Sequence, residues 1–125
     1  MKNLSAAKLI ELHERIIKNT GGEPGVLFLG TLEYIEHFLE SESILDTDIM
    51  KTAAKILIAI IQGHPFVDGN KRTGFEATDI FLVRNGYYIN CTPDEGVDFA
   101  LSIARNELKE DKIEEWLNKH TKRIK

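Results

Sequence analysis

The stretch "IIQGHPFVDGNKRTGFEATDIF", Ile60–Phe81, places a polar cluster between two apolar segments. The segment before it has the apolar spacing of a nearly enclosed helix, with Ala53, Ala54, Leu57, Ile58 and Ile61. That helix cannot run far past Gly63, because Pro65 lacks an N–H and biases His64 away from helical torsions. The sequence therefore predicts a tight polar loop between two helices anchored in the core.

The segment after the loop predicts a helix that starts near Asn70 and ends at Asn85–Gly86, a favourable left-handed stop. Its apolar side consists of Phe75, Thr78, Phe81 and Leu82. Another helix is expected over residues 31–39. The helix before the polar loop has three candidate caps, Asp46, Thr47 and Asp48.

Both ends of the chain also show helical periodicity. Near the start, Leu9, Leu12 and Ile16 share one helix face, and Ser5 and Gly21 are the expected cap and stop. Near the end, the capping box Thr92-Pro-Asp-Glu95 predicts a helix with four inward residues, Ala100, Leu101, Ala104 and Leu108. A similar box at 111–114 predicts a last helix that buries Ile113, Trp116 and Leu117.

These elements predict an all-α fold, a compact bundle of about six helices in a single domain over residues 1–125. The segment "GGEPGVLFLG", residues 21–30, holds four glycines and a proline and predicts a short flap loop or hairpin. The piece "YYIN" at 87–90 is expected to be extended, but no strand pattern is long enough to build a sheet. The basic tail "KHTKRIK", residues 119–125, is expected to be solvated and frayed.

Composition excludes several classes of protein. No apolar run approaches the length of a membrane-spanning helix, and the first residues have no signal-peptide pattern. Cys91 is the one cysteine, so an internal disulfide is excluded and a cytoplasmic location is expected. The net charge of −4 argues against nucleic-acid binding, leaving a DNA-binding regulator built on the tail as a minor alternative. The oligomeric state is not indicated.

The polar loop combines groups that suit a phosphate ligand. It leads into a helix start, where backbone N–H groups lack partners and the helix dipole is positive. Gly69 lets the main chain approach an anion, and Asn70 can cap the helix or face a ligand oxygen. Lys71 and Arg72 place two cations in the first helical turn, where a structural helix favours acids. A bound polyphosphate would resolve that conflict.

The same loop holds a candidate metal ligand and a candidate base. Asp68 is its one acid, and Mg²⁺ is commonly held by one or two carboxylates together with phosphate oxygens. His64 is the side chain here that titrates near neutral pH, which makes it the natural general base. Structural alternatives remain: His64, Asp68 and Asn70 can be cap or turn residues, and Arg72 can pair with Glu76.

Other polar residues are expected to be structural. Phe66 is expected to anchor the loop in the core. Three further histidines, His13, His37 and His120, are expected at the surface or its boundary. Thr73 and Thr78 are expected to pack rather than react, and a zinc site at the loop is disfavoured because no further Cys or His completes a ligand set.

The motif "HPFVDGNKR", residues 64–72, resembles the signature of the Fic/Doc family, and every defined position of that signature matches. The segment "LIELHERIIKNTGGEPG", residues 9–25, is similar to the start of Doc-type (death-on-curing) proteins. The resemblance covers residues 4–89, and it implies the all-helical Fic/Doc bundle.

The resemblance implies a nucleotide-dependent transferase that modifies a hydroxyl of a target protein, with ATP as substrate and Mg²⁺ as cofactor. In that reaction His64 would be the general base, Asp68 would hold Mg²⁺, and Arg72 would grip a phosphate. Gly69, Asn70 and the following amides would form the anion hole. Lys71 is typical of Doc-type members, which transfer the γ-phosphoryl group to a Thr or Ser hydroxyl, a translation elongation factor being the family's known target. Adenylylating members have glycine there, and AMP transfer or a non-catalytic phosphate-binding module remain the alternatives.

Two further features bear on partners. The inhibitory pattern Ser/Thr-x-x-x-Glu-Gly/Asn of self-restrained Fic proteins is absent, because no Ser or Thr has Glu four residues later. The resemblance then implies a toxin restrained by an antitoxin on a separate chain. The flap that follows "GGEPG" reads "VLFLG", Val26–Gly30, where Doc-type relatives usually have a polar stretch containing Asp. In the family this loop holds the target by strand-like pairing; here the apolar version can bind a target, pack into the core, or contact another subunit.

Overall fold

A computed structural model describes residues 4–41 and 49–125. Its helices are α1 (Ala6–Thr20), α2 (Leu29–Ser41), α3 (Ile49–Leu57), the π-helix η2 (Ile58–Gln62), α4 (Asn70–Arg84), α5 (Pro93–Ala104) and α6 (Glu110–His120). Its strands are β1 (Tyr87–Ile89) and β2 (Thr121–Arg123). The predicted all-α bundle is confirmed. In the described ranges no helix is both long and apolar enough to cross a membrane.

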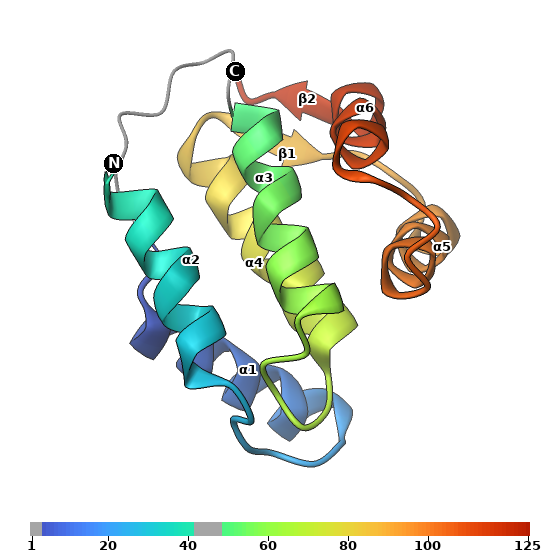
Figure 1. Ribbon diagram of the computed structural model, residues 1–125. Coiled ribbons are helices and arrows are strands. Elements are labelled where there is room, and N and C mark those ends of the chain that lie inside the picture. The colour runs from blue at the N-terminus through green and yellow to red at the C-terminus, as the bar shows by residue number, and fades with distance from the viewer. Residues whose placement is uncertain (1–3, 42–48) are drawn as a thin grey trace.

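Helices α3 and α4 run side by side through the middle of the molecule (Figure 1). Helix α2 lies on one side of them and α5 and α6 lie on the other, while α1 runs across their lower ends (Figure 1). The core between these layers is apolar, and Leu9, Leu32, Ile56, Leu57 and Leu82 have no exposed surface. The loops before α2 and before α4 meet at one end of the bundle, so residues far apart in sequence form one surface there (Figure 1).

Most helix ends follow the predicted local chemistry. The Ser5 hydroxyl accepts a hydrogen bond from the Lys8 N–H at 3.1 Å, and α1 stops at Gly21. The capping box at Thr92 is present, with both of its reciprocal hydrogen bonds. Helix α4 spans the predicted residues, and α2 begins two residues before the predicted position 31. The candidate caps Asp46, Thr47 and Asp48 lie outside the described residues.

Three local predictions about the last third of the chain are wrong. Helix α6 begins at Glu110 after Lys109, with no side-chain cap, rather than through a box at 111–114. The buried residues of α5 are Phe99, Ala100 and Ile103, whereas Ala104 is exposed. The basic tail is not frayed: β2 pairs antiparallel with β1, with Tyr88 opposite Lys122. Each strand is too short to be stable alone, and the pair forms because α6 delivers one strand beside the other.

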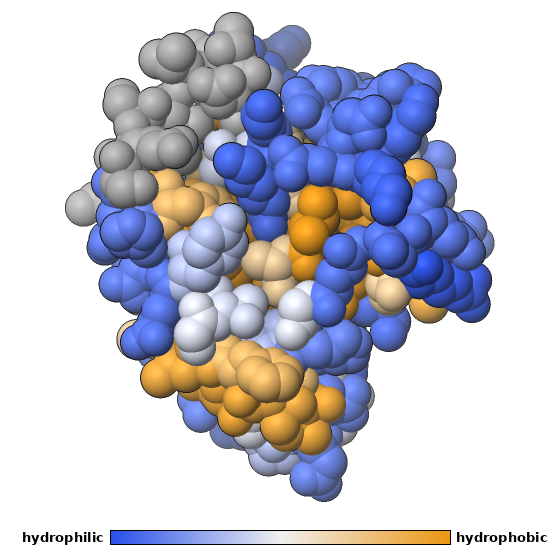
Figure 2. Space-filling model, viewed as in Figure 1, coloured by the Kyte–Doolittle hydropathy of each residue, from blue (hydrophilic) through white to orange (hydrophobic). Residues whose placement is uncertain are grey.

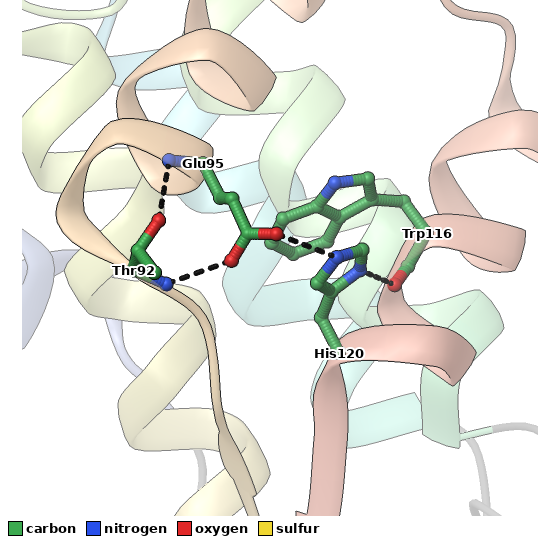
Figure 3. A network of polar contacts seen from close by, with 4 residues as sticks. All are labelled: Thr92, Glu95, Trp116 and His120. Carbon is green, nitrogen blue, oxygen red and sulfur yellow. Dashed lines mark hydrogen bonds and ion pairs between the residues drawn. The ribbon is translucent and has the colours of Figure 1, made fainter.

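A small polar network joins α5 to the end of α6 (Figure 3). The Glu95 carboxylate accepts a hydrogen bond from the Thr92 N–H at 2.8 Å and lies 3.8 Å from His120 Nε2. His120 Nδ1 donates to the Trp116 carbonyl oxygen at 2.8 Å, and the two rings stack. Trp116 in turn stacks on Phe99 of α5. Glu95 therefore supports both the start of α5 and its contact with α6.

Replacing Glu95 by glutamine is expected to lower stability at neutral pH but much less in acid. The hydrogen bond from the Thr92 backbone N–H lowers the pKa of Glu95; burial opposes this in part, and the Thr92 hydroxyl and His120 add smaller lowering effects. A lowered folded-state pKa stabilises the protein above the ordinary glutamate pKa of about 4.3, and this contribution disappears as pH falls through the folded-state value. The measurement is Tm against pH for the wild type, Glu95→Gln and the exposed control Glu33→Gln. A Tm difference that does not shrink in acid would contradict the assignment.

Candidate active site

The polar loop begins after an unusual helix end. The last turn of the α3 segment is the π-helix η2, in which the Gly63 N–H donates to the Ile58 carbonyl oxygen. A Cβ on Gly63 would collide with the Ala59 carbonyl oxygen, so this turn requires glycine. His64 then adopts φ 49°, a left-handed conformation that is uncommon outside glycine. Both features are frequent at functional sites, and together they leave the His64 side chain exposed.

Asn70 holds the loop together from inside. Its Oδ1 accepts from the Phe66 N–H at 3.0 Å, and its Nδ2 donates to the Phe66 carbonyl oxygen at 2.9 Å. The same Nδ2 lies 2.9 Å from His64 Nδ1. Because an amide nitrogen only donates, Nδ1 is the acceptor, and a neutral His64 in this arrangement carries its proton on Nε2. Asn70 is therefore a loop clamp that orients the imidazole; the residue at the N-cap position of α4 is Gly69.

The start of α4 has backbone amides that no side chain caps. Gly69 adopts φ 76°, and no side chain caps the first turn of the helix. The Gly69 N–H itself is engaged by Asp68 Oδ1 at 2.9 Å. The next amides, those of Asn70, Lys71 and Arg72, belong to the first turn and have no carbonyl partner within the helix. The predicted residues Asp68, Gly69, Asn70, Lys71 and Arg72 thus lie together at this helix start. Gly69 differs from the prediction in one respect, because its N–H bonds to Asp68 rather than remaining free for a ligand.

Asp68 is an exposed carboxylate held by backbone groups. Its Oδ2 accepts from the Glu23 N–H at 3.3 Å, so it joins the flap to the loop. Hydrogen bonds from the Gly69 and Glu23 backbones lower the pKa of Asp68, with further lowering by Arg72 and Lys71 and an opposing effect of burial. The carboxylate therefore stays ionised at neutral pH with lone pairs to spare. Among the described residues no cluster of three or more His, Cys, Asp or Glu could hold a metal, so a Mg²⁺ ion at Asp68 would need phosphate oxygens as well.

Neither Lys71 nor Arg72 forms an ion pair among the described side chains. Lys71 and Arg72 are both exposed. The Arg72 guanidinium donates to the Thr20 hydroxyl and lies 3.5 Å from the Gly21 carbonyl oxygen, at the end of α1. The alternative pairing with Glu76 is not formed among the described side chains. Arg72 is thus held by neutral oxygens, which an anion can displace.

His13 is a supporting residue that the sequence interpretation missed. It was expected near the surface, but its side chain is 1% exposed. Its Nε2 donates to the Asp68 carbonyl oxygen at 2.7 Å, and its ring stacks on Phe66 at 3.8 Å between centroids. Phe66 is fully buried, as predicted, so the two rings anchor the loop in the core. The signal was present in the sequence, since His13 falls four residues after Leu9 and four before Ile17 on the buried face of α1.

A groove of about 830 Å³ opens beside the start of α4, between α1, α4 and α5. Its floor is largely apolar and includes Ile16, Phe75 and Leu101. Its charged lining residues are the cations Arg15, Lys71 and Arg72 and the acids Glu76 and Asp79. His64 is not among its lining residues. The groove therefore adjoins Lys71 and Arg72 rather than His64.

Comparisons with known proteins agree with this arrangement. Residues 3–82 match the model of the Fic/DOC family. "Protein kinase doc" of Escherichia phage P1 is 31% identical over 121 residues, which cover 95% of this chain and 95% of that protein. The fold is similar to the crystal structure of BepC protein, a VirB-translocated effector of Bartonella tribocorum, with bound AMPPNP. That comparison has a TM-score of 0.73 at 14% identity, covering 100% of this chain and 78% of the other.

A second solved structure gives the same fold. It is the N-terminal Fic domain of a cell filamentation protein, a VirB-translocated Bep effector, from Bartonella quintana. It has a TM-score of 0.71 at 16% identity and covers 98% of this chain and 73% of that one. The family match includes the whole polar loop, all of α3 and η2, and all but the last two residues of α4. The chain therefore belongs to the Fic/Doc family.

Proposed function

We propose that this protein is a Doc-like toxin that transfers the γ-phosphoryl group of ATP to a Ser or Thr hydroxyl of a target protein. The observation that carries the proposal is the 31% identity with the phage protein kinase doc across 95% of both chains. The loop geometry supports it, because an exposed imidazole, an ionised carboxylate and an uncapped helix start meet within residues 64–72. Phosphoryl transfer needs mostly such positioning and charge stabilisation.

In the proposed reaction each loop residue has one task. The amides at the start of α4 and the Arg72 guanidinium bind phosphate oxygens, and Asp68 would hold a Mg²⁺ ion that offsets their charge. His64 takes the proton of the acceptor hydroxyl. For Nε2 to act as that base, the ring must move its own proton to Nδ1 and give up the hydrogen bond from Asn70. The described geometry is therefore the resting one, and the arrival of both substrates would shift it.

AMP transfer is the second candidate. It is supported by the bound AMPPNP in the BepC structure, whose fold this chain shares, and by family membership. Lys71 favours phosphoryl transfer, because its bulk and charge occupy the helix start where adenylylating relatives have glycine. A module that binds phosphate without turnover is the remaining alternative.

The position of the label decides between these functions. The protein is incubated with a cell lysate and ATP labelled at the γ-phosphate or, in parallel, at the α-phosphate. Phosphoryl transfer is expected to label a protein from γ-labelled ATP alone, whereas AMP transfer labels it from α-labelled ATP. Binding of ATP without either label would support the non-catalytic module. An Arg72→Ala sample is the control, since loss of the phosphate grip is expected to remove the label.

We also propose that an antitoxin on another chain fills the groove between α1, α4 and α5. The apolar floor suits the apolar face of a helix, and the cations at its edge suit an acidic residue. A segment bound there would reach Lys71 and Arg72 and compete with the nucleotide's phosphates. Coexpression with the neighbouring gene product, followed by ATP titration of the purified complex, tests this. Unchanged ATP affinity in the complex would contradict it.

A further inference from the structure

The two ends of the bundle carry different kinds of surface. At the end with the polar loop, the flap side chains are not buried, so the alternative that they pack into the core is wrong; Leu27 is 56% exposed and Phe28 is 55% exposed. At the other end of α4 lie the strands β1 and β2 (Figure 1). Figure 2 shows an apolar area at the first end and a hydrophilic surface where β2 and α6 lie. Helix α4 has 15 residues, so it separates the two ends by about 20 Å.

The strands bring together two stretches of sequence that lack acids. Residues 80–93 and 116–125 contain no Asp or Glu, so all 20 acids lie in the rest of the chain. Five of the 16 Lys and Arg residues fall in these stretches: Arg84, Lys119, Lys122, Arg123 and Lys125. An acidic protein thus has a basic surface at this end. Such a separation of charge indicates a negatively charged partner.

The strand β2 presents two of these cations to solvent. Lys122 and Arg123 are exposed and project from opposite faces of the two-stranded sheet. Lys122 lies directly opposite Tyr88, which is 38% exposed. The Arg123 guanidinium donates to the Tyr87 hydroxyl at 3.0 Å and lies over that ring, 5.2 Å from its centroid. In residues 4–41 and 49–125 neither cation has an ion-pair partner, so both charges are available to a carboxylate.

The backbone of β2 forms an open edge. The Ile124 N–H donates to the Gly86 carbonyl oxygen at 2.8 Å, so these two residues are a hydrogen-bonded pair of the ladder. Hydrogen-bonded and non-hydrogen-bonded pairs alternate between antiparallel strands. The N–H and C=O groups of Thr121 and Arg123 therefore point away from β1. Helix α4 packs against β1, which leaves β2 as the accessible edge of the sheet.

We propose that the outer edge of β2 docks an extended acidic segment of another protein, which adds a third strand to the sheet. The backbone of that segment would pair with Thr121 and Arg123, and its carboxylates would pair with Lys122 and Arg123. A nucleic acid fits less well, because it has no peptide groups to pair with the edge and the acids in the rest of the chain would repel a long polyanion. This inference does not depend on the transfer reaction. The structural alternative is that the cations only protect the edge from pairing with other chains.

Peptide binding tests the proposal. A fluorescein-labelled peptide of alternating Glu and Val is titrated with the protein at low salt, and binding is followed by fluorescence anisotropy. Three ligands are compared with it: the same peptide with Gln in place of Glu, its backbone N-methylated form, and an oligothymidylate of equal charge. The proteins are the wild type, Lys122→Glu on β2, and Lys8→Glu on α1 as the matched control. Lys8 is also exposed and has no ion pair among the described side chains, so its substitution tests the change in net charge alone.

The wild type is expected to bind the Glu peptide about tenfold more tightly than the Gln peptide or the N-methylated form, because these lack the charges or the backbone donors. Lys122→Glu is expected to weaken binding of the Glu peptide about tenfold, while Lys8→Glu behaves nearly as the wild type. Equal binding of the N-methylated and unmodified peptides, or equal weakening by both substitutions, would overturn strand addition at β2. Tighter binding of the oligothymidylate would assign the surface to a nucleic acid, and no binding of any ligand would assign the cations to protection of the edge. Either of these results would overturn the proposal as well.

Discussion

Replacing His64 is expected to reduce transfer of the labelled group by about three orders of magnitude while leaving the fold intact. The reduction is the usual contribution of a positioned general base. The fold should survive because the side chain is exposed and its one described hydrogen bond is with Asn70, which retains two others. Transfer is measured with labelled ATP and Tm by circular dichroism.

The choice of variant matters because His64 has φ 49°. Alanine is disfavoured in that conformation, whereas asparagine adopts it readily and keeps an acceptor for the Asn70 amide. His64→Asn is therefore the cleaner test, with His64→Ala beside it. Transfer at the wild-type rate by the asparagine variant would remove the histidine from the mechanism. Loss of transfer together with a large fall in Tm would assign it a structural role instead.

Replacing Gly63 by alanine is expected to be the most destabilising change at the site. The added methyl group would meet the Ala59 carbonyl oxygen, a backbone atom that can move only if the π-turn re-forms. Overpacking of this kind costs about 1–3 kcal/mol, which corresponds to a fall in Tm of about 4–11 °C for a domain of this size. Transfer should fall too, because the re-formed turn would redirect His64.

Gly30→Ala is the matched control for that change. Gly30 lies near the start of α2, and nothing is within 4 Å of a Cβ built there. Alanine is favoured over glycine in a helix, so this variant is expected to be neutral or slightly stabilised. A Gly63→Ala protein as stable as Gly30→Ala would show that the π-turn relaxes freely and that glycine is not required.

Local chemistry explains why so much of the fold could be predicted. The caps at Ser5 and Thr92 and the stop after Arg84 each depend on a few adjacent residues, and all three are where the sequence places them. The polar loop was also predictable, since Gly63 and Pro65 end one helix and Asn70 begins the next. The motif within this loop is continuous, so its residues came together without any knowledge of the tertiary fold.

The missed features depend on contacts between distant segments. Strand β2 forms because α6 places residues 121–123 against residues 87–89, and the basic composition of the tail gave no sign of that pairing. His13 is buried because the Asp68 carbonyl oxygen, 55 residues away, accepts its N–H. The π-turn likewise goes together with tertiary contacts: the loop that follows it bonds to His13 of α1 and to the flap. Apolar periodicity cannot distinguish such a turn from an ordinary helical one.

In the proposed reaction, the position of Arg72 would affect how tightly a nucleotide binds. Its guanidinium is already occupied by oxygens of Thr20 and Gly21, so an incoming phosphate exchanges one set of partners for another. Measured affinity would therefore report a difference between two states of the arginine rather than the full strength of its bond to phosphate. In the same exchange the end of α1 would lose its tether to Arg72, so phosphate binding at the proposed site would loosen the contact between α1 and the start of α4.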